Sequence, residues 1–137
     1  MQTIINATEA RKEWGMFIDG VVRGKPEVVK RNRDYFLSIS LEQTLRLLDG
    51  YRFQADILPE DDGSITLALT EIDLVVNAPD LNSAKEELAA ELISYSQDYF
   101  NEIQMYYNAP NRKPHFPYVL KVSLLENIND IVGLIDA

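Results

Sequence analysis

The chain has 137 residues, of which 46% are hydrophobic and 26% charged, so it can bury one ordinary core or two small ones. It has no cysteine and a single histidine, His115, which excludes disulfides, a cysteine nucleophile and a metal centre made from several histidines of one chain. No apolar run approaches the roughly 20 residues of a membrane span, and the first residues lack a secretory pattern, so we expect a cytoplasmic protein with no membrane partner.

The net charge of −9 is unevenly spread along the chain. Residues 1–52 contain nine Lys or Arg and seven Asp or Glu, whereas residues 53–137 contain four and fifteen. Chance can produce such a split in a soluble protein. It is equally compatible with two modules, of which the first meets a polyanion and the second a basic protein.

The first 50 residues predict a strand, a helix, a hairpin and a second helix. After a short apolar stretch at residues 3–5, Asn6 can cap a helix, with Glu9 as its capping-box partner. Gly24 and the proline after Lys25 should end that helix. The apolar positions of the helix recur every three or four residues, at Ala10, Trp14, Phe17, Ile18, Val21 and Val22.

A hairpin should follow this helix. Its strands are expected at residues 27–30 and 35–40, and its turn at residues 31–34, where Asn32 tolerates the left-handed conformation of a tight turn. Ser40 should then cap the second helix. The apolar stripe of that helix consists of Leu41, Leu45 and Leu48.

Residues 51–137 predict a small antiparallel sheet packed on a long helix, which makes the whole chain α+β. Alternating apolar and polar residues indicate strands at 51–57 and 64–70, joined by a turn at 59–63, and a third strand at 74–76. A long helix should run from a cap at Ser83 to about Tyr107. Its apolar positions are Leu88, Leu92, Tyr95, Tyr99, Ile103 and Tyr106.

The last 30 residues give weaker signals. Residues 108–117 contain three prolines and are expected to form a loop. Residues 118–125 fit a strand or a helix, because their periodicity does not decide. Residues 127–135 place their apolar side chains on one helical face and should form a short helix.

Few residue patterns suggest chemistry. The acidic turn Glu60–Gly63 lacks the first and last ligands of a calcium loop, so a solvated hairpin turn explains it better. His115 stands beside Arg112 and Lys113 without a visible partner, and a surface loop is the better interpretation. We therefore expect no catalytic, cofactor-binding or metal site. Four tyrosines at helical spacing suit a core or a protein interface better than base stacking: Tyr95, Tyr99, Tyr106 and Tyr107.

The basic residues of the first half have the chemistry of DNA binding. Arg11 and Lys12 should lie in the first turns of the capped helix, off its apolar face, and Lys30, Arg31 and Arg33 at the hairpin tip. Arg binds guanine or phosphate through two parallel hydrogen bonds, and Lys supplies a point charge. A helix N-terminus adds amide donors for phosphate. Short basic clusters are also common on ordinary surfaces, so these residues alone leave both interpretations open.

Five short motifs follow one another in the first half. They are Asn-Ala-Thr-Glu-Ala-Arg at 6–11, Trp-Gly-Met-Phe-Ile at 14–18, Gly-Lys-Pro at 24–26, Val-Val-Lys-Arg-Asn-Arg at 28–33 and Leu-Ser-Ile-Ser-Leu-Glu at 37–42. In this order they resemble the Phd/YefM antitoxin family over about a third of the chain. Asn32 stands where that family often has glycine, which asparagine can mimic sterically.

The resemblance implies that residues 1–50 form a dimeric DNA-binding module. In that family the helix N-terminus and the basic hairpin face operator DNA. Carried over, Arg11 is the expected base or phosphate contact, and Arg31 and Arg33 would hold the groove or backbone. Secondary contacts would come from Lys30, Lys12, Asn6 and Thr8.

Residues 51–137 differ from the usual tail of that family. Their acidic turn at 59–63 and the start of the long helix, with Ala84, Glu86, Glu87 and Leu88, are loosely similar to the HicB-like antitoxin domain. The resemblance implies a folded, acidic partner-binding module of α+β type.

These observations predict an antitoxin of a type II toxin–antitoxin system. Residues 1–50 would repress the operon as a homodimer or higher even oligomer, and residues 51–137 would neutralise a cognate toxin, a basic RNA-acting enzyme encoded nearby. A stand-alone transcriptional regulator, whose second module senses a ligand or only dimerises, is the alternative. A small enzyme or adaptor is a third possibility, for which Asp56, Glu60 and Asp62 offer acid–base groups but no nucleophile–base pair is present.

Overall fold

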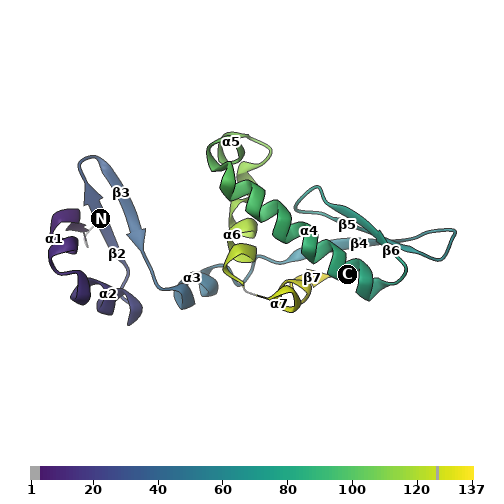
Figure 1. The fold of residues 1–137 in the computed structure, drawn as a ribbon, viewed down its shortest axis with the longest axis horizontal. Helices are drawn as coiled ribbons and strands as arrows, with labels where there is room; N and C mark the ends of the chain where they lie inside the picture. The colour runs from purple at the N-terminus through teal and green to yellow at the C-terminus, as the bar shows by residue number, and fades with distance from the viewer. Residues whose placement is uncertain (1–3, 126) are drawn as a thin grey trace. The chain divides into compact units, whose positions relative to one another are not determined.

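The computed structural model describes residues 4–125 and 127–137. The chain divides into two compact units, which we call unit 1 (residues 1–47) and unit 2 (residues 48–137). Each unit has its own small sheet and its own helices, so the predicted α+β class is confirmed (Figure 1).

Unit 1 contains a three-stranded sheet and three helices. In chain order they are β1 (Ile4–Asn6), α1 (Ala7–Lys12), α2 (Trp14–Val22), β2 (Glu27–Arg31), β3 (Asp34–Ser38) and α3 (Leu41–Leu47). The strand order is β1-β2-β3, with β1 parallel and β3 antiparallel to β2. The predicted hairpin is confirmed, and Asn32 in its turn has a φ of 56°.

The predicted first helix is in fact two helices. They meet at Glu13, whose φ of −109° and ψ of 39° lie outside helical geometry. Glu13 donates its N–H to Glu9 and accepts from Phe17, so hydrogen bonding continues across the break. The apolar periodicity runs through this point without a glycine or proline to mark it, which is why the sequence predicted one helix.

The two helix caps predicted in unit 1 are confirmed. The Asn6 side chain accepts a hydrogen bond from the N–H of Thr8 at 3.0 Å. The Ser40 hydroxyl accepts from the N–H of Gln43 at 3.2 Å. The Gln43 side chain also donates to the carbonyl of Gly24 at 2.8 Å, so the cap of α3 is tied to the end of α2.

The core of unit 1 is small. Ala10 of α1 and Val29 of β2 are buried, whereas α2 and α3 contain no buried residue. The sheet face that carries Val29 is the buried one, and helix α1 packs against β1 and β2. The opposite face carries an apolar row in register, Ile4, Val28 and Leu37, whose outer members are left exposed by the described residues of unit 1.

Four of the nine apolar positions predicted for the helix faces of the first 50 residues are in fact exposed: Trp14, Ile18, Val22 and Leu41. Helices α2 and α3 also leave Met16 and Leu47 in solvent. At 47 residues, a unit with so little buried apolar surface gains stability when another surface covers it.

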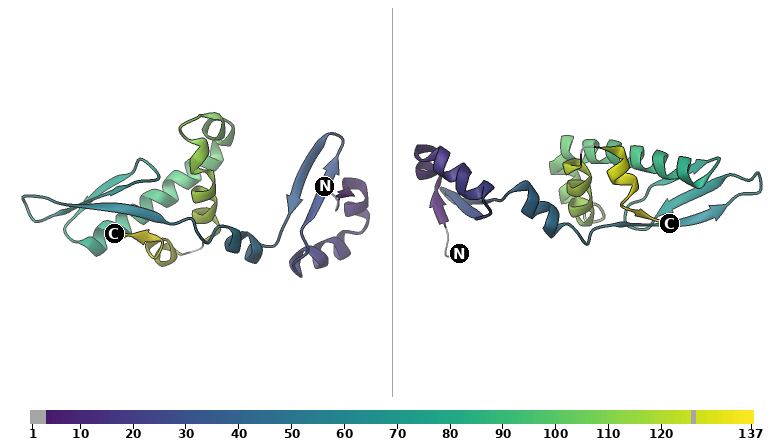
Figure 2. Two further views of the ribbon diagram at one scale, coloured as in Figure 1. Left: turned by 180° about the vertical axis from the view of Figure 1, so that it is seen from behind. Right: turned by 90° about the horizontal axis from the view of Figure 1, so that it is seen from below.

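Unit 2 consists of a four-stranded sheet and a layer of helices. In chain order they are β4 (Phe53–Pro59), β5 (Ile65–Leu69), β6 (Val75–Ala78), α4 (Leu81–Asn101), α5 (Ile103–Asn108), η1 (Lys113–His115), α6 (Phe116–Leu124), α7 (Ile128–Val132) and β7 (Ile135–Asp136). The strand order is β6-β5-β4-β7, and β7 pairs in parallel with β4. Helix α4 packs along one face of the sheet (Figure 2).

The core of unit 2 lies between this sheet and the helices. Its fully buried side chains come from every layer and include Phe53, Leu67, Leu88, Leu92, Tyr99, Val119 and Ile131. Tyr95 and Tyr106 pack against this core from its edge. The interpretation of the tyrosine series as core is thus confirmed for its central members, whereas Tyr107 is exposed.

The predicted long helix begins and ends at other residues. Its cap is Asp80, whose carboxylate accepts from the N–H of Ser83 at 2.8 Å, so Ser83 lies inside α4. The helix stops at Asn101, and α5 follows after Glu102, whose φ of −124° and ψ of 44° repeat the geometry found at Glu13.

Three predictions for the last 30 residues change. The expected loop at 108–117 includes η1 and the start of α6. Pro117 lies in the first turn of α6, where the backbone N–H that proline lacks would have no acceptor within the helix. Residues 118–125 lie almost wholly in α6, which settles the open choice for a helix. The helix expected at 127–135 ends at Val132, and Ile135, the last residue of the expected helix, begins β7.

None of the helices in the described parts of the chain is long and apolar enough to cross a membrane.

Candidate DNA-binding and partner-binding surfaces

The basic residues that the sequence assigned to DNA binding are all exposed. Five cations are exposed and form no ion pair with another described residue: Arg11, Lys12, Lys30, Arg31 and Arg33. They are therefore free to contact phosphate, although Asp34 pairs in register with Arg31 and places one carboxylate beside the hairpin turn.

The sheet brings part of this set together. Asn6, at the end of β1, pairs in register with Lys30 on β2, so the start of α1 lies beside the base of the hairpin tip. Arg31 and Arg33 flank Asn32 in the turn, and Lys30 Nζ lies 5.6 Å from the centroid of the Tyr35 ring.

One expectation for this surface needs correction. Because α1 ends at Lys12, Arg11 and Lys12 lie in its last turn and not in the first turns of a long helix. The N–H of Thr8 is already bonded to the side chain of Asn6. Asn6 therefore has a capping role in this structure, whatever it contacts in a complex.

Unit 2 is strongly acidic, with sixteen Asp or Glu and five Lys or Arg over residues 48–137. Its β4–β5 hairpin projects past the rest of the unit (Figure 1). Ile57 and Leu58 are 40% and 49% exposed there, on opposite faces of β4. Four carboxylates of the same hairpin are also exposed: Asp56, Glu60, Asp61 and Asp62. We call these six residues the hairpin surface.

The tip of this hairpin is the turn that the sequence predicted. Gly63 has a φ of 86°, and the Asp62 carboxylate accepts from the N–H of Ser64 at 3.0 Å. The hydrogen bonds from Ser64 lower the pKa of Asp62, so this carboxylate stays charged at neutral pH.

A second polar cluster in unit 2 surrounds His115. The Tyr95 hydroxyl lies 2.6 Å from His115 Nδ1, and an Nη of Arg112 donates to the same hydroxyl at 3.1 Å. The Tyr99 hydroxyl donates to the Arg112 carbonyl at 2.9 Å. Arg112 also stacks on Tyr106, its guanidinium carbon 5.2 Å from the ring centroid.

The prediction that His115 is a surface-loop residue is wrong. Only 9% of the residue is exposed, and burial, with Arg112 adding its charge, lowers the pKa of the imidazole. Burial also raises the pKa of Tyr95, so both side chains are neutral at pH 7. Since Arg112 donates to the Tyr95 oxygen, we assign the phenolic proton to the bond with His115.

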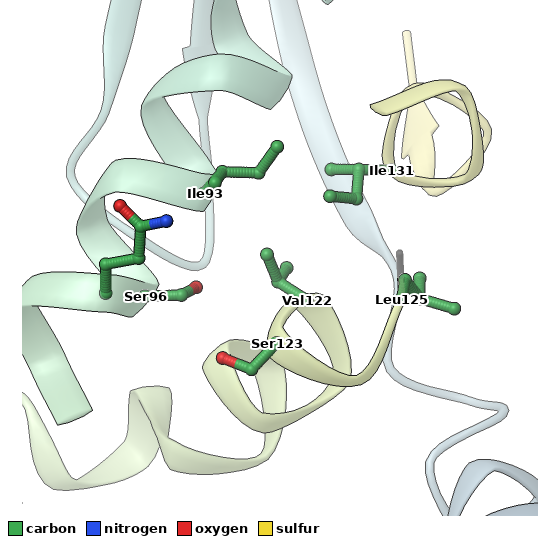
Figure 3. Close-up of a pocket in the computed structure, with 7 residues that line it drawn as sticks. Ile93, Ser96, Val122, Ser123, Leu125 and Ile131 are labelled. Carbon is green, nitrogen blue, oxygen red and sulfur yellow. The ribbon is translucent and has the colours of Figure 1, made fainter. Parts of the chain in front are cut away.

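A cavity of about 300 Å³ lies between α4, α6 and α7. Its walls are of mixed character: Ile93, Val122, Leu125 and Ile131 are apolar, whereas Ser96, Ser123 and Gln97 add hydroxyl and amide groups (Figure 3). The Ser96 hydroxyl is buried and has no hydrogen-bond partner among the described residues. The space beside it is large enough for a water molecule.

Residues 4–125 and 127–137 contain no group of three or more His, Asp or Glu side chains placed to hold a metal ion.

Comparison with known proteins identifies the class of molecule. A family model described as "PHD_like: Antitoxin of toxin-antitoxin, RelE / RelB, TA system" matches residues 1–137. The chain belongs to this antitoxin family. Membership implies a cognate toxin as the partner of this antitoxin.

The antitoxin is also similar to a solved structure over its full length. That structure is described as the crystal structure of an antitoxin part of a putative toxin/antitoxin system from Syntrophomonas wolfei subsp. wolfei at 1.80 Å resolution. The sequences are 44% identical, the match covers 99% of this chain and 97% of the other, and the TM-score is 0.94. Among curated proteins, none matches the antitoxin.

The cluster around His115 is the feature of the antitoxin that sequence reasoning missed. Its members are separated by up to 20 residues and meet because α4 and η1 fold against each other. The neighbouring Arg112 and His115 were a visible signal, but the prolines around them indicated a loop.

Proposed function

We propose that this antitoxin acts as a homodimer that binds operator DNA through unit 1 and neutralises its toxin through unit 2. The observation that carries the proposal is the division of charge between the units. Residues 1–47 contain eight Lys or Arg and six Asp or Glu, whereas residues 48–137 contain five and sixteen. A polyanion favours the first surface and a basic protein the second.

In this proposal the hairpin of unit 1 enters a DNA groove. Arg31 and Arg33 lie on a tight turn that projects them into solvent, and Lys30 stands just behind them. Arg11 and Lys12 hold the phosphate backbone from the end of α1. Assignment of unit 1 to the Phd/YefM family, and of unit 2 to the HicB-like type, is part of the proposal.

The uncovered face of the unit 1 sheet supports a dimer. Ile4 and Leu37 are 42% and 55% exposed, in one row with the half-buried Val28. A second copy of the same face would bury this row and supply the core that one unit 1 lacks. Two-fold symmetry of the protein also matches the two half-sites of a palindromic operator.

The hairpin surface of unit 2 supports binding of a basic toxin. Leu58 offers an exposed apolar side chain on the strand face that also carries Asp56, and Glu60, Asp61 and Asp62 add exposed carboxylates at the end of the hairpin. Interfaces commonly combine a central apolar patch with a charged rim that steers association. The toxin that fits this surface is a basic protein, such as an RNA-acting enzyme.

Salt-dependent DNA binding tests the first half of the proposal. Binding to the DNA upstream of the gene is measured against salt concentration for the wild type and for Arg31→Ala with Arg33→Ala. We expect weaker binding and a log–log salt slope flatter by about one to two, because two phosphate-neutralising charges are lost.

A matched double variant controls for net charge. Arg23→Ala with Arg46→Ala removes the same charge from unit 1 at positions away from the hairpin. It should leave the slope close to that of the wild type. Equal slopes for the wild type and the Arg31, Arg33 variant would remove the hairpin from the interface.

Co-purification tests the second half of the proposal. The antitoxin is expressed together with the product of the neighbouring gene, which carries the affinity tag. We expect a stoichiometric complex that dissociates on substitution of the hairpin surface. A neighbouring product that never retains the antitoxin would count against it.

A further inference from the structure

A small pocket in unit 2 gathers the donors that bind a carboxylate. The cavity, of about 230 Å³, lies where α4, α5 and η1 meet the segment between β5 and β6. The polar and aromatic side chains in its wall are Asp73, Tyr95, Tyr106, Asn111, Arg112 and His115. Its volume is below the usual range for drug-sized ligands and suits a single amino-acid side chain.

Arg112 is held in place inside this pocket, and several of its guanidinium N–H donors have no acceptor among the described residues. One Nη donates to the Tyr95 hydroxyl at 3.1 Å, and the guanidinium carbon lies 5.7 Å and 5.2 Å from the ring centroids of Tyr95 and Tyr106. It forms no ion pair with a described residue. A guanidinium has five N–H donors, so its forked side remains free for an anion at little entropic cost.

The Tyr95 hydroxyl is in turn fixed by His115 at 2.6 Å, and the Arg112 backbone is fixed by Tyr99. The position of the guanidinium is therefore set by three side chains that belong to the core or its edge. This is the support that a binding group needs if it is to act with defined geometry.

The charges around the pocket select the kind of anion. Asp73 lies in its wall, and unit 2 as a whole carries an excess of eleven acidic over basic residues. This field opposes a doubly charged phosphate or a nucleic-acid backbone much more than a single carboxylate that pairs with Arg112.

We propose that this pocket receives one carboxylate, presented by an aspartate or glutamate side chain of the toxin, with Arg112 as the binding group. The inference rests on the proposed binding of the toxin by unit 2. In this contact the antitoxin supplies the cation and the toxin the carboxylate, which is the reverse of the acidic hairpin surface. Two contacts of opposite charge fix the orientation of the toxin on unit 2 as well as attracting it.

The test compares three variants in the complex of the full-length antitoxin with the product of the neighbouring gene. Arg112→Gln should weaken binding about 10- to 100-fold, because the partner carboxylate loses its forked donor. Arg112→Lys, which keeps the charge without the fork, should lie between it and the wild type. Lys113→Gln removes the same charge one residue away and should change the affinity less than about 2-fold.

Replacement of each Asp and Glu of the toxin by its amide identifies the partner group. We expect one of them to be non-additive with Arg112→Gln in a double-mutant cycle. The inference would be overturned if Arg112→Gln bound the toxin as tightly as the wild type, or if Lys113→Gln lost as much affinity as Arg112→Gln. It would also be overturned if every toxin carboxylate were additive with Arg112→Gln. Melting temperatures of the free variants show whether a loss reflects unfolding.

A titration without the toxin separates this inference from the proposed function. Sodium acetate and sodium phosphate are added to the free antitoxin at constant ionic strength, and the Arg112 Nε–H signal is followed by NMR. Acetate should shift the signal more than phosphate at equal concentration. A larger response to phosphate would overturn the choice of a carboxylate. If the wild-type chain bound no toxin, the proposed function would be overturned, but the titration would still test whether the pocket binds a carboxylate.

Discussion

At the scale of single residues, His115 couples the fold of unit 2 to pH. Burial lowers the pKa of the folded imidazole below its ordinary value of 6.5. The unfolded chain therefore binds a proton that the folded chain rejects. The contribution of neutral His115 to the free energy of unfolding is fully present above about pH 6.5, the pKa of His115 in the unfolded chain. It is lost as the pH falls from there toward the lower pKa of His115 in the folded chain.

We expect this loss to be visible in urea unfolding at pH 7.5 and pH 5.5. His115→Gln removes the titrating group, so it should be less stable than the wild type at pH 7.5 and close to it at pH 5.5. The carboxylates titrate alike in the wild type and the variant, so their effect cancels in the difference between the two free energies of unfolding. A stability difference that is the same at both pH values would show that His115 does not carry this dependence.

At the scale of secondary-structure elements, a buried lysine ties α6 to the segment before β4. Lys121 is 7% exposed, and its Nζ donates to the carbonyls of Tyr51 at 2.8 Å and Asp49 at 3.3 Å. Burial lowers the pKa of the amine, and these carbonyls are its hydrogen-bond acceptors.

Lys121→Met keeps the apolar stem and removes these bonds. We expect the free energy of unfolding to fall by about 1–3 kcal/mol, because two carbonyls lose their donor. Lys113→Met, at an exposed position, should change it by less than about 0.5 kcal/mol. Equal stabilities of the two variants by urea titration would contradict the structural role of Lys121.

The elements that the sequence predicted well are those with local signals. The turn at Asn32, the cap at Ser40 and the turn at Gly63 depend on residues within a few positions of one another, and all three are confirmed. The helix breaks at Glu13 and Glu102 were missed, because no residue with special backbone preferences marks them.

The other errors depend on tertiary contacts. The two residues of β7 become a strand only because they pair with β4, about 80 positions earlier, where Arg52 binds Asp136 through two hydrogen bonds of 2.9 Å. The periodicity of residues 127–135 contains no trace of that partner. Likewise, Pro117 was taken as part of a loop although a helix begins beside it.

At the scale of the whole molecule, two exposed apolar surfaces are assigned to two different partners. Leu37→Glu places a charge on the uncovered sheet face of unit 1, and Leu58→Glu places the same charge on the hairpin surface of unit 2. The first should convert a dimer, with twice the 15.6 kDa of one chain, into monomers in sedimentation equilibrium. The second should leave the dimer intact and weaken toxin binding.

Opposite results, in which Leu58→Glu breaks the dimer or Leu37→Glu alone weakens the toxin complex, would reverse the assignment of the surfaces. A wild-type chain that sediments as a monomer at micromolar concentration would contradict the dimer.

The candidate sites were predictable to different degrees. The cations of unit 1 were visible because they lie within 23 consecutive positions, from Arg11 to Arg33, and stay on the surface. The exposure of Leu58 was not visible, since it depends on how far the hairpin extends beyond the core, and the position of Arg112 was not visible, since it depends on tertiary contacts with Tyr95 and Tyr106. A pattern of apolar residues does not encode that extent.

The measurement that tests the central claim most directly is a growth assay with the neighbouring gene. Its product is induced alone, together with the wild-type antitoxin, and together with the Arg31→Ala, Arg33→Ala variant under an unrelated promoter. The account predicts arrested growth in the first case and restored growth in both others, because neutralisation belongs to unit 2 and repression to unit 1. Continued growth with the neighbouring product alone, or arrest that persists beside the wild-type antitoxin, would contradict it.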